Sequence, residues 1–322
     1  MTKEKTMREA VNVAPIEGYV NDIRIEDTKI NGKDAITGEV DVLTSSDSVH
    51  TINVFSFKLN KEGKESGLYK GYDTVRKEYK SIKEYGKEAA DKVRIDQAKI
   101  GKNEYVGQDG EFKSYPRLTA NFINRVKDND VFEPKAKFEL EMVVANMVEE
   151  KRNGEETGRL ILKGYVPGYQ ETNDATRKIF PFEVVVAEPH SVGYVQNTYE
   201  RGNTVKIFGN IVNQTIVTEK QIEVGFGAPH TQTDRKEVRE YVVTGGTPPY
   251  DEDDKNAYDM VLIKAALKER EAAIEKKKEE KKAKANNQGG SVNTGFGTKP
   301  AVEDPFADDG KPIDISEEDL PF

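Results

Sequence analysis

The alternation of apolar and polar residues through the first 250 residues most limits what this chain can fold into. Segments 35–44 and 159–166 alternate with a period of two, which is typical of strands that bury one face. The turn dipeptides Asn31-Gly32 and Asn153-Gly154 separate the first two such segments in each half. The same order therefore occurs twice: strand, Asn-Gly turn, strand, short loop, strand, helical insert, strand. The expected strands are 18–27, 35–44, 49–59 and 117–127, then 138–149, 159–166, 178–187, 204–217 and 237–244.

A helix between the third and fourth of five short strands is the plan of an OB-fold, a small Greek-key barrel. We therefore expect a mainly β protein with two tandem OB-fold units that carry inserted helices. Two unrelated β-sandwich modules are the alternative. The expected organisation is an N-terminal arm at 1–15, OB-folds at 16–132 and 133–247, a charged helix at 251–285, and a flexible linker with an acidic tip at 286–322.

The helical inserts differ between the halves. Segment 67–91 repeats tyrosines at helical spacing, and such a stripe indicates core packing against the barrel more often than a stacking platform. Segment 191–201 predicts a shorter helix. Segment 251–285 begins with acidic residues and ends with lysines, a polarity that suits the helix dipole.

Composition excludes several classes of function. The 322 residues include no cysteine, which removes disulfide scaffolds and thiolate zinc sites. The three histidines are scattered, and no nucleotide-cradling or nucleophile motif is present, so we expect neither an enzyme nor a cofactor. No apolar run reaches the roughly 20 residues of a membrane span, and no secretory signal precedes the body. We expect a cytoplasmic protein that does not bind membranes.

The tail carries much of the net charge of −9. Residues 286–322 contain eight carboxylates against two lysines, so the rest of the chain is only slightly acidic. The tail ends in Asp314-Ile315-Ser316-Glu317-Glu318-Asp319-Leu320-Pro321-Phe322. Such a segment suits a basic pocket with a slot for a ring. This tip resembles those of bacterial and phage single-stranded DNA-binding proteins, in which acid-rich tails end in Pro-Phe. The predicted interaction residues are Asp314, Ile315, Glu317, Glu318, Asp319, Leu320, Pro321 and Phe322.

A second resemblance lies inside the body. The run Val184–Ala187, a helix through Tyr199-Glu200-Arg201-Gly202, and Val205–Gly209 resemble the third strand, helix and fourth strand of bacterial single-stranded DNA-binding domains. The chain departs from those domains because it has no tryptophan and two apparent barrels. The resemblance therefore points to tandem-barrel, phage-like members, with a monomer or dimer favoured over a tetramer, and a host cytoplasm if the protein is phage-encoded.

Binding to single strands needs cations for phosphates and flat rings for bases. In each half, one face of the strands combines both, whereas the opposite face is apolar. Phe55 and Phe57 alternate with Val54 and Ser56, and the pattern leaves open which pair faces the core. The predicted single-stranded DNA contacts are Lys113, Tyr115, Arg117, Asn121, Arg125, Arg159, Lys163, Tyr165, Tyr169, Arg177, Lys178, Phe180, Lys206 and Phe208.

The resemblance implies a protein that coats single-stranded DNA during replication, recombination and repair. Its tip would recruit a polymerase, helicase or recombination factor. The alternative is a protein-interaction adaptor with OB-like barrels and a docking tail.

Overall fold

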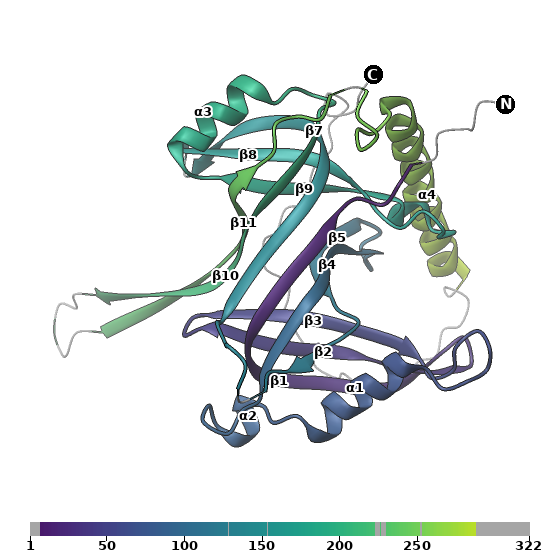
Figure 1. The fold of residues 1–322 in the computed structure, drawn as a ribbon, viewed down its shortest axis with the longest axis vertical. Helices are drawn as coiled ribbons and strands as arrows, with labels where there is room; N and C mark the ends of the chain where they lie inside the picture. Colours follow the sequence, from purple (N-terminus) through teal and green to yellow (C-terminus); the bar gives the residue numbers. More distant parts are fainter. Residues whose placement is uncertain are drawn as a thin grey trace.

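One continuous sheet closes on itself twice to form two barrels (Figure 1). It is seen in a computed structural model that describes residues 7–287, except 128, 153, 223–225, 227–229 and 252. Residues outside these ranges include Asn153 of the second predicted turn and the whole predicted tip.

The first barrel, barrel 1, is closed by the order of its strand pairings. β1 pairs with β2, β2 with β3, β4 with β5, and β1 with β4, all antiparallel, whereas β3 and β5 run parallel. A short β6, Asn124–Arg125, pairs with β4. The strands are β1 Asn12–Ile30, β2 Lys33–Ser45, β3 Ser48–Phe57, β4 Lys92–Val106 and β5 Phe112–Thr119.

The second barrel, barrel 2, repeats this connectivity. β7 pairs with β8, β8 with β9, β10 with β11, and β7 with β10, all antiparallel, and β9 and β11 run parallel. A helix follows the third strand in both barrels, so both have the OB-fold plan and the predicted fold class is confirmed. The strands are β7 Lys135–Arg152, β8 Glu155–Pro167, β9 Ile179–Val186, β10 Thr204–Ile222 and β11 His230–Gly246.

The structure corrects several element boundaries. β1 begins at Asn12, inside the expected arm, and the fourth strand of barrel 1, β4, was not predicted. The expected strand 117–127 ends at Thr119, and beyond it Phe122 is 65% exposed whereas Ile123 is buried. The insert expected as one helix forms α1, Gly67–Glu78, and α2, Ile82–Tyr85. The shorter insert is α3, Pro189–Thr198.

The tyrosine stripe of α1 packs against barrel 1, as expected. Tyr72 is buried and donates from its hydroxyl to the carbonyl of Ala120 at 2.8 Å. The hydroxyl of Tyr79 reaches the carbonyl of Ile123 at 2.9 Å. The helix therefore closes one end of the barrel with rings whose polar ends are satisfied.

The backbone conformation of the turn between β1 and β2 explains why Asn31 and Gly32 occur there. Asn31 has φ of 51° and Gly32 has φ of 76°. Both values lie in the left-handed region that asparagine and glycine adopt most readily, which suits a two-residue hairpin between twisted strands.

The two barrels are joined by main-chain pairing. The first residues of β1 pair with β7, between Asn12 and Leu140 and between Glu17 and Lys135. Glu17 is only 2% exposed, and its carboxylate receives hydrogen bonds from Arg94 at 2.9 Å and from the Glu133 amide at 3.2 Å. Burial alone would raise the pKa of Glu17, but these bonds and the nearby cations lower it overall. The carboxylate thus stays charged and fixes the link between the barrels.

The C-terminal helix α4, Met260–Asn287, spans the joint. It starts later than the predicted charged helix at 251–285, and it packs against the body of the protein, since Arg270 is only 3% exposed. The guanidinium of Arg270 donates to the carbonyl of Ile179 at 3.1 Å and also contacts the carbonyl of Thr176 and the carboxylate of Glu104. Thus α4 ties barrel 2 to β4 of barrel 1. No helix in the described part of the chain is long and apolar enough to cross a membrane.

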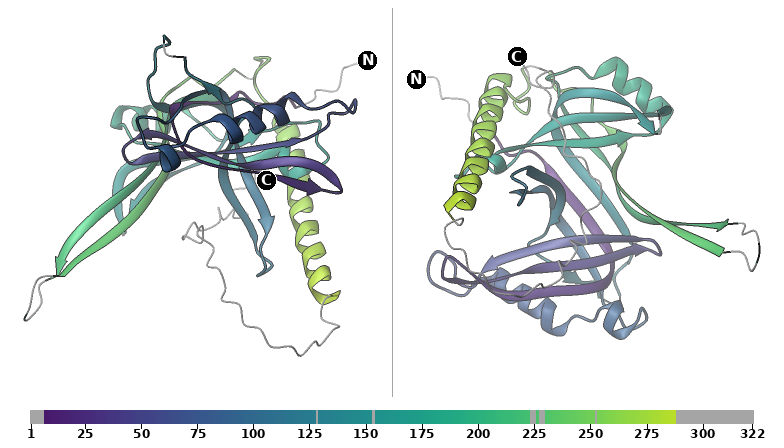
Figure 2. Two further views of the ribbon diagram at one scale, coloured as in Figure 1. Left: turned by 90° about the horizontal axis from the view of Figure 1, so that it is seen from below. Right: turned by 180° about the vertical axis from the view of Figure 1, so that it is seen from behind.

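Three elements extend to the same side of the molecule. The β4–β5 hairpin, the β10–β11 hairpin and α4 all point downward in the left view of Figure 2. The β10–β11 hairpin also reaches barrel 1, where the Asn213 amide donates to the carbonyl of Val49 at 2.5 Å. This side is therefore built from both barrels.

His50 lies inside barrel 1 and gives a testable pH dependence. It is 1% exposed, its Nε2 lies 3.1 Å from the hydroxyls of Ser48 and Thr44, and burial lowers its pKa to about 4. The unfolded chain takes up a proton below about pH 6.5, whereas the folded protein does so only near pH 4, so stability falls as the pH drops between these values. We expect wild type to lose about 2 kcal/mol of unfolding free energy between pH 7 and pH 5 that His50→Gln does not lose. Urea titrations at both pH values measure this difference, and equal losses in the two proteins would contradict it.

Candidate functional site

The third strand of barrel 1 places two rings on its outer surface. Ile52, Val54 and Ser56 of β3 are buried, whereas Phe55 and Phe57, on the alternate positions, point outward with 44% and 37% exposure. Their rings meet edge to face with centroids 5.1 Å apart. Exposed neighbouring rings of this kind are available for stacking.

The β4–β5 hairpin adds cations and two more rings. Register pairs Tyr105 with Lys113 and Asn103 with Tyr115, so these side chains share one face with Arg117, the next position of that parity. The rings of Tyr105 and Tyr115 lie 6.3 Å apart with a tilt of 33°. The predicted parity of Lys113, Tyr115 and Arg117 therefore corresponds to one surface of the hairpin.

These two surfaces adjoin. β3 and β5 pair through Ile52–Leu118 and Asn53–Thr119, and the Asn53 amide donates to the carbonyl of Leu118 at 3.3 Å. We call the combined outer surface the aromatic–basic face, and it consists of Phe55, Phe57, Tyr105, Lys113, Tyr115 and Arg117.

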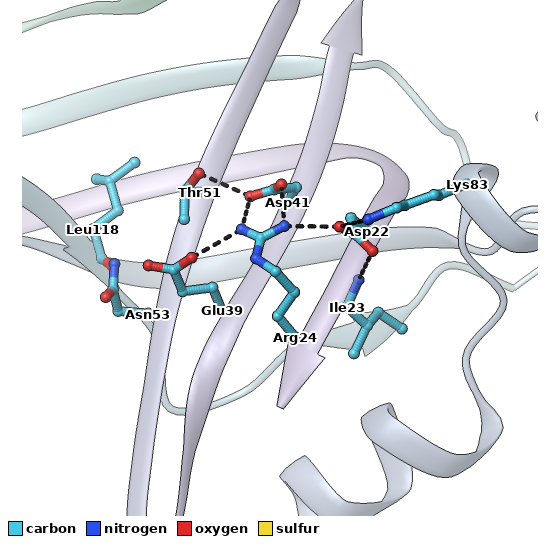
Figure 3. A network of polar contacts seen from close by, with 9 residues as sticks. All are labelled: Asp22, Ile23, Arg24, Glu39, Asp41, Thr51, Asn53, Lys83 and Leu118. Atoms are coloured by element: carbon cyan, nitrogen blue, oxygen red, sulfur yellow. Dashed lines mark hydrogen bonds and ion pairs between the residues drawn. The ribbon is translucent and has the colours of Figure 1, made fainter. Parts of the chain in front are cut away.

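An acidic network borders this face on β1 and β2 (Figure 3). Arg24 donates to Asp41 at 2.7 Å, to Glu39 at 2.8 Å and to Asp22 at 2.9 Å. The hydrogen bonds that Arg24 donates to Asp41 and to the other carboxylates outweigh burial and raise the pKa of Arg24. Lys83 also binds Asp22, at 2.8 Å, so two cations face three carboxylates and neither is available to an anion. Within the described residues, no group of three or more acidic or histidine side chains could hold a metal ion.

Two predicted contact residues are wrong for stacking because they belong to the core. Tyr165 is 4% exposed and Phe180 is 6% exposed. The last four residues of β8 and the first four of β9 are all buried, so the alternation of faces ends there. The short helix η1, Ala175–Arg177, and α4 both pack against β9, which covers this end of the sheet.

Most of the predicted cations form an ion pair with a carboxylate of the same chain. The ion pairs of barrel 2 are close, with Lys206 3.0 Å from Glu139 and Arg159 2.5 Å from Glu240. The remaining pairs join Lys163 to Glu183, Lys178 to Glu269, Lys113 to Asp109, Arg125 to Asp91 and Arg177 to Asp174. Arg117 is the exception among the predicted cations, because it has no ion pair or hydrogen bond within the described chain.

The other predicted residues are not among the six that define the aromatic–basic face. Phe208 on β10 is 45% exposed, and its ring lies over Gly245, where an added Cβ would come within 2.6 Å of it. Tyr169 is 53% exposed in the loop after β8. Arg125 stacks on the Tyr79 ring at 4.2 Å, which makes it a structural contact. Asn121 is exposed beyond the end of β5.

Sequence reasoning missed Phe55, Phe57 and Tyr105. The missed signal was the β4–β5 register, which would have paired Tyr105 with Lys113. For β3 the deciding information was that polar Ser56 and His50 face the interior.

Comparison with known proteins gives one family and a set of distant structures. A family model described as YorF matches residues 10–280, which include both barrels and most of α4. A deletion mutant of the single-stranded DNA-binding protein from Thermus aquaticus has a TM-score of 0.46 at 10% identity, covering 78% of this chain and 100% of that one. The wild-type protein from Thermus aquaticus has a TM-score of 0.44 at 10% identity, with coverages of 77% and 97%. No curated protein sequence matches.

The placement of Tyr165 in the core and of Tyr115 at the surface can be tested by measuring the stability of variants. We expect Tyr165→Ala to cost about 3 kcal/mol of unfolding free energy because it empties a core site, and Tyr115→Ala to cost less than about 1 kcal/mol. Chemical denaturation of both variants measures this contrast. Equal costs would show that the two rings do not differ in burial.

Proposed function

The chain belongs to the YorF family, and we propose that it binds single-stranded DNA through the aromatic–basic face of barrel 1. The observation that carries this proposal is the set of four rings and two cations on the outside of β3, β4 and β5. OB-folds commonly bind oligonucleotides on the face of their second and third strands and through the loop between the fourth and fifth. Phe55 and Phe57 lie on the third strand, and Tyr105 and Lys113 lie beside that loop.

The chemistry of the face favours unpaired strands. Bases stack on aromatic side chains with about 1–3 kcal/mol per base, and they can do so only when they are not stacked in a duplex. Arg117 and Lys113 would meet phosphates along the same path. The network around Arg24, with three carboxylates against two cations, repels phosphates and so favours a path along β3 and β5 over one across β1 and β2.

We propose that the protein coats exposed strands during DNA replication, recombination and repair, in the cytoplasm. It would act by binding and protection without catalysing a reaction, as a monomer or dimer. Since the binding face lies within one chain, this role does not require a second copy.

Binding is tested by fluorescence-anisotropy titration of labelled oligo-dT, with a duplex of equal length as control, at two salt concentrations. We expect binding to the single strand to be much tighter than to the duplex and to weaken as salt rises, with a log–log slope of about −0.7 per phosphate contact. Phe55→Ala and Phe57→Ala should each lose about tenfold or more in affinity.

The matched control is Tyr85→Ala, because Tyr85 is an exposed ring on α2, away from the aromatic–basic face. It should bind as wild type does. Absence of any preference for the single strand in wild type would overturn the proposed function and favour the adaptor.

We propose that the segment Asp314–Phe322 recruits a polymerase, a helicase or a recombination factor. Its four carboxylates and Phe322 suit a basic pocket with an apolar slot. A labelled peptide of residues 306–322 should bind such a partner protein, and the Phe322→Ala peptide should bind at least about tenfold more weakly because it lacks the ring. Titration of both peptides against purified replication proteins measures this, and equal affinities would contradict the proposed role of Phe322.

A further inference from the structure

The joint between the barrels brings a loop of barrel 2 against the hairpin of barrel 1. Arg270 of α4 binds Glu104 on β4 and the carbonyls of Thr176 and Ile179, which flank Arg177 and Lys178. The ammonium of Lys102 on β4 also lies 5.4 Å from the centre of the Phe182 ring on β9. These contacts hold η1, which ends at Arg177, beside the β4–β5 hairpin.

Arg117 is a cation of the aromatic–basic face that the folded chain leaves uncompensated. It lies on β5 opposite Gly101, it is partly buried, and no carboxylate or other acceptor in the described residues binds it. By contrast, Arg24 on the same barrel surface is held by three carboxylates. A guanidinium keeps its charge at all ordinary pH values, so Arg117 retains a full positive charge without a partner.

Arg177 of barrel 2 lies close enough to Arg117 to act on it electrostatically. Burial, and then the positive charge of Arg177, lower the pKa of Arg117. Arg177 itself is 74% exposed at its side chain, and its Nε lies 3.8 Å from Asp174. That carboxylate is already held by Lys277 at 3.0 Å and by Thr176, so it compensates Arg177 only in part.

We propose that Arg117 and Arg177 hold one phosphate of the DNA strand between them, so that both barrels grip the same strand. The proposal rests on the proposed function. Two guanidiniums that repel each other in the free protein are both neutralised when an anion sits between them, and their planar forks suit phosphate oxygens. Tyr115 lies two positions before Arg117 on the same face, so a base stacked there would leave its phosphate near the pair.

We call this shared phosphate site of Arg117 and Arg177 the clamp. It is tested with Arg117→Met, Arg177→Met and the double variant, each titrated with oligo-dT over a range of salt concentrations. Each single variant should lose about tenfold in affinity, and each should lower the steepness of the salt dependence by about 0.7. The double variant should lose little more affinity than either single variant. Both arginines are proposed to hold the same phosphate, so the second substitution removes no further phosphate contact.

Two controls separate a shared phosphate site from a general effect of lost positive charge and from a structural role of Arg117. Arg76→Met removes a guanidinium of α1 that is bound to Asp27 and Asp73, and it should bind DNA as wild type does. The melting temperature of DNA-free Arg117→Met should equal or exceed that of wild type, because no internal partner is lost. A lower melting temperature would assign Arg117 a structural role and overturn the clamp.

The remaining outcomes are equally distinct. If wild type binds oligo-dT but neither arginine variant weakens binding, the clamp is wrong and the proposed function stands. If the double variant loses about a hundredfold, the arginines contact separate phosphates and the shared site is wrong. If wild type does not bind oligo-dT, the proposed function and the clamp that rests on it fail together.

Discussion

The arrangement of the molecule depends on β1, a strand that belongs to both barrels. β1 pairs with β2 and β4 to close barrel 1, and its first residues pair with β7 of barrel 2. Because side chains alternate along a strand, a slip of one residue would exchange the inside and outside of a barrel. The buried carboxylate of Glu17, bound by Arg94, reinforces this register at the joint. The barrels are therefore held in one orientation.

Charge is distributed unevenly over the surface of this acidic protein. The net charge is −9, and most of the cations expected to contact DNA are bound to carboxylates of the same chain. Such pairs lose much of their attraction for phosphate, since the carboxylate must be displaced or stays nearby. What distinguishes one surface from another is thus the local absence of carboxylates. Arg117 has that property, because no carboxylate in the described residues binds it, whereas three carboxylates bind Arg24.

The order and faces of most strands could be predicted from the sequence because burial there follows alternation. The parity of Lys113, Tyr115 and Arg117 is an example. Alternation fails where both faces are covered, as at Tyr165, which lies at an end of the sheet whose neighbouring strand β9 contacts η1 and α4. It is ambiguous in β3, where Ser56 is buried and hydrogen-bonded to Ser66 whereas the phenylalanines beside it are exposed. No local pattern reports that Arg117 lacks a carboxylate, because that depends on strands distant in sequence.

Hydroxyl-radical footprinting of aromatic side chains, with and without bound oligo-dT, tests most directly where the strand lies. Oxidation rates of individual rings report solvent access in the intact protein. The account predicts that DNA protects Phe55, Phe57, Tyr105 and Tyr115, while Tyr85 on α2 and Tyr194 on α3 react as before. Protection of Tyr85 or Tyr194 with unchanged reactivity on β3 and the β4–β5 hairpin would contradict the assignment of the aromatic–basic face.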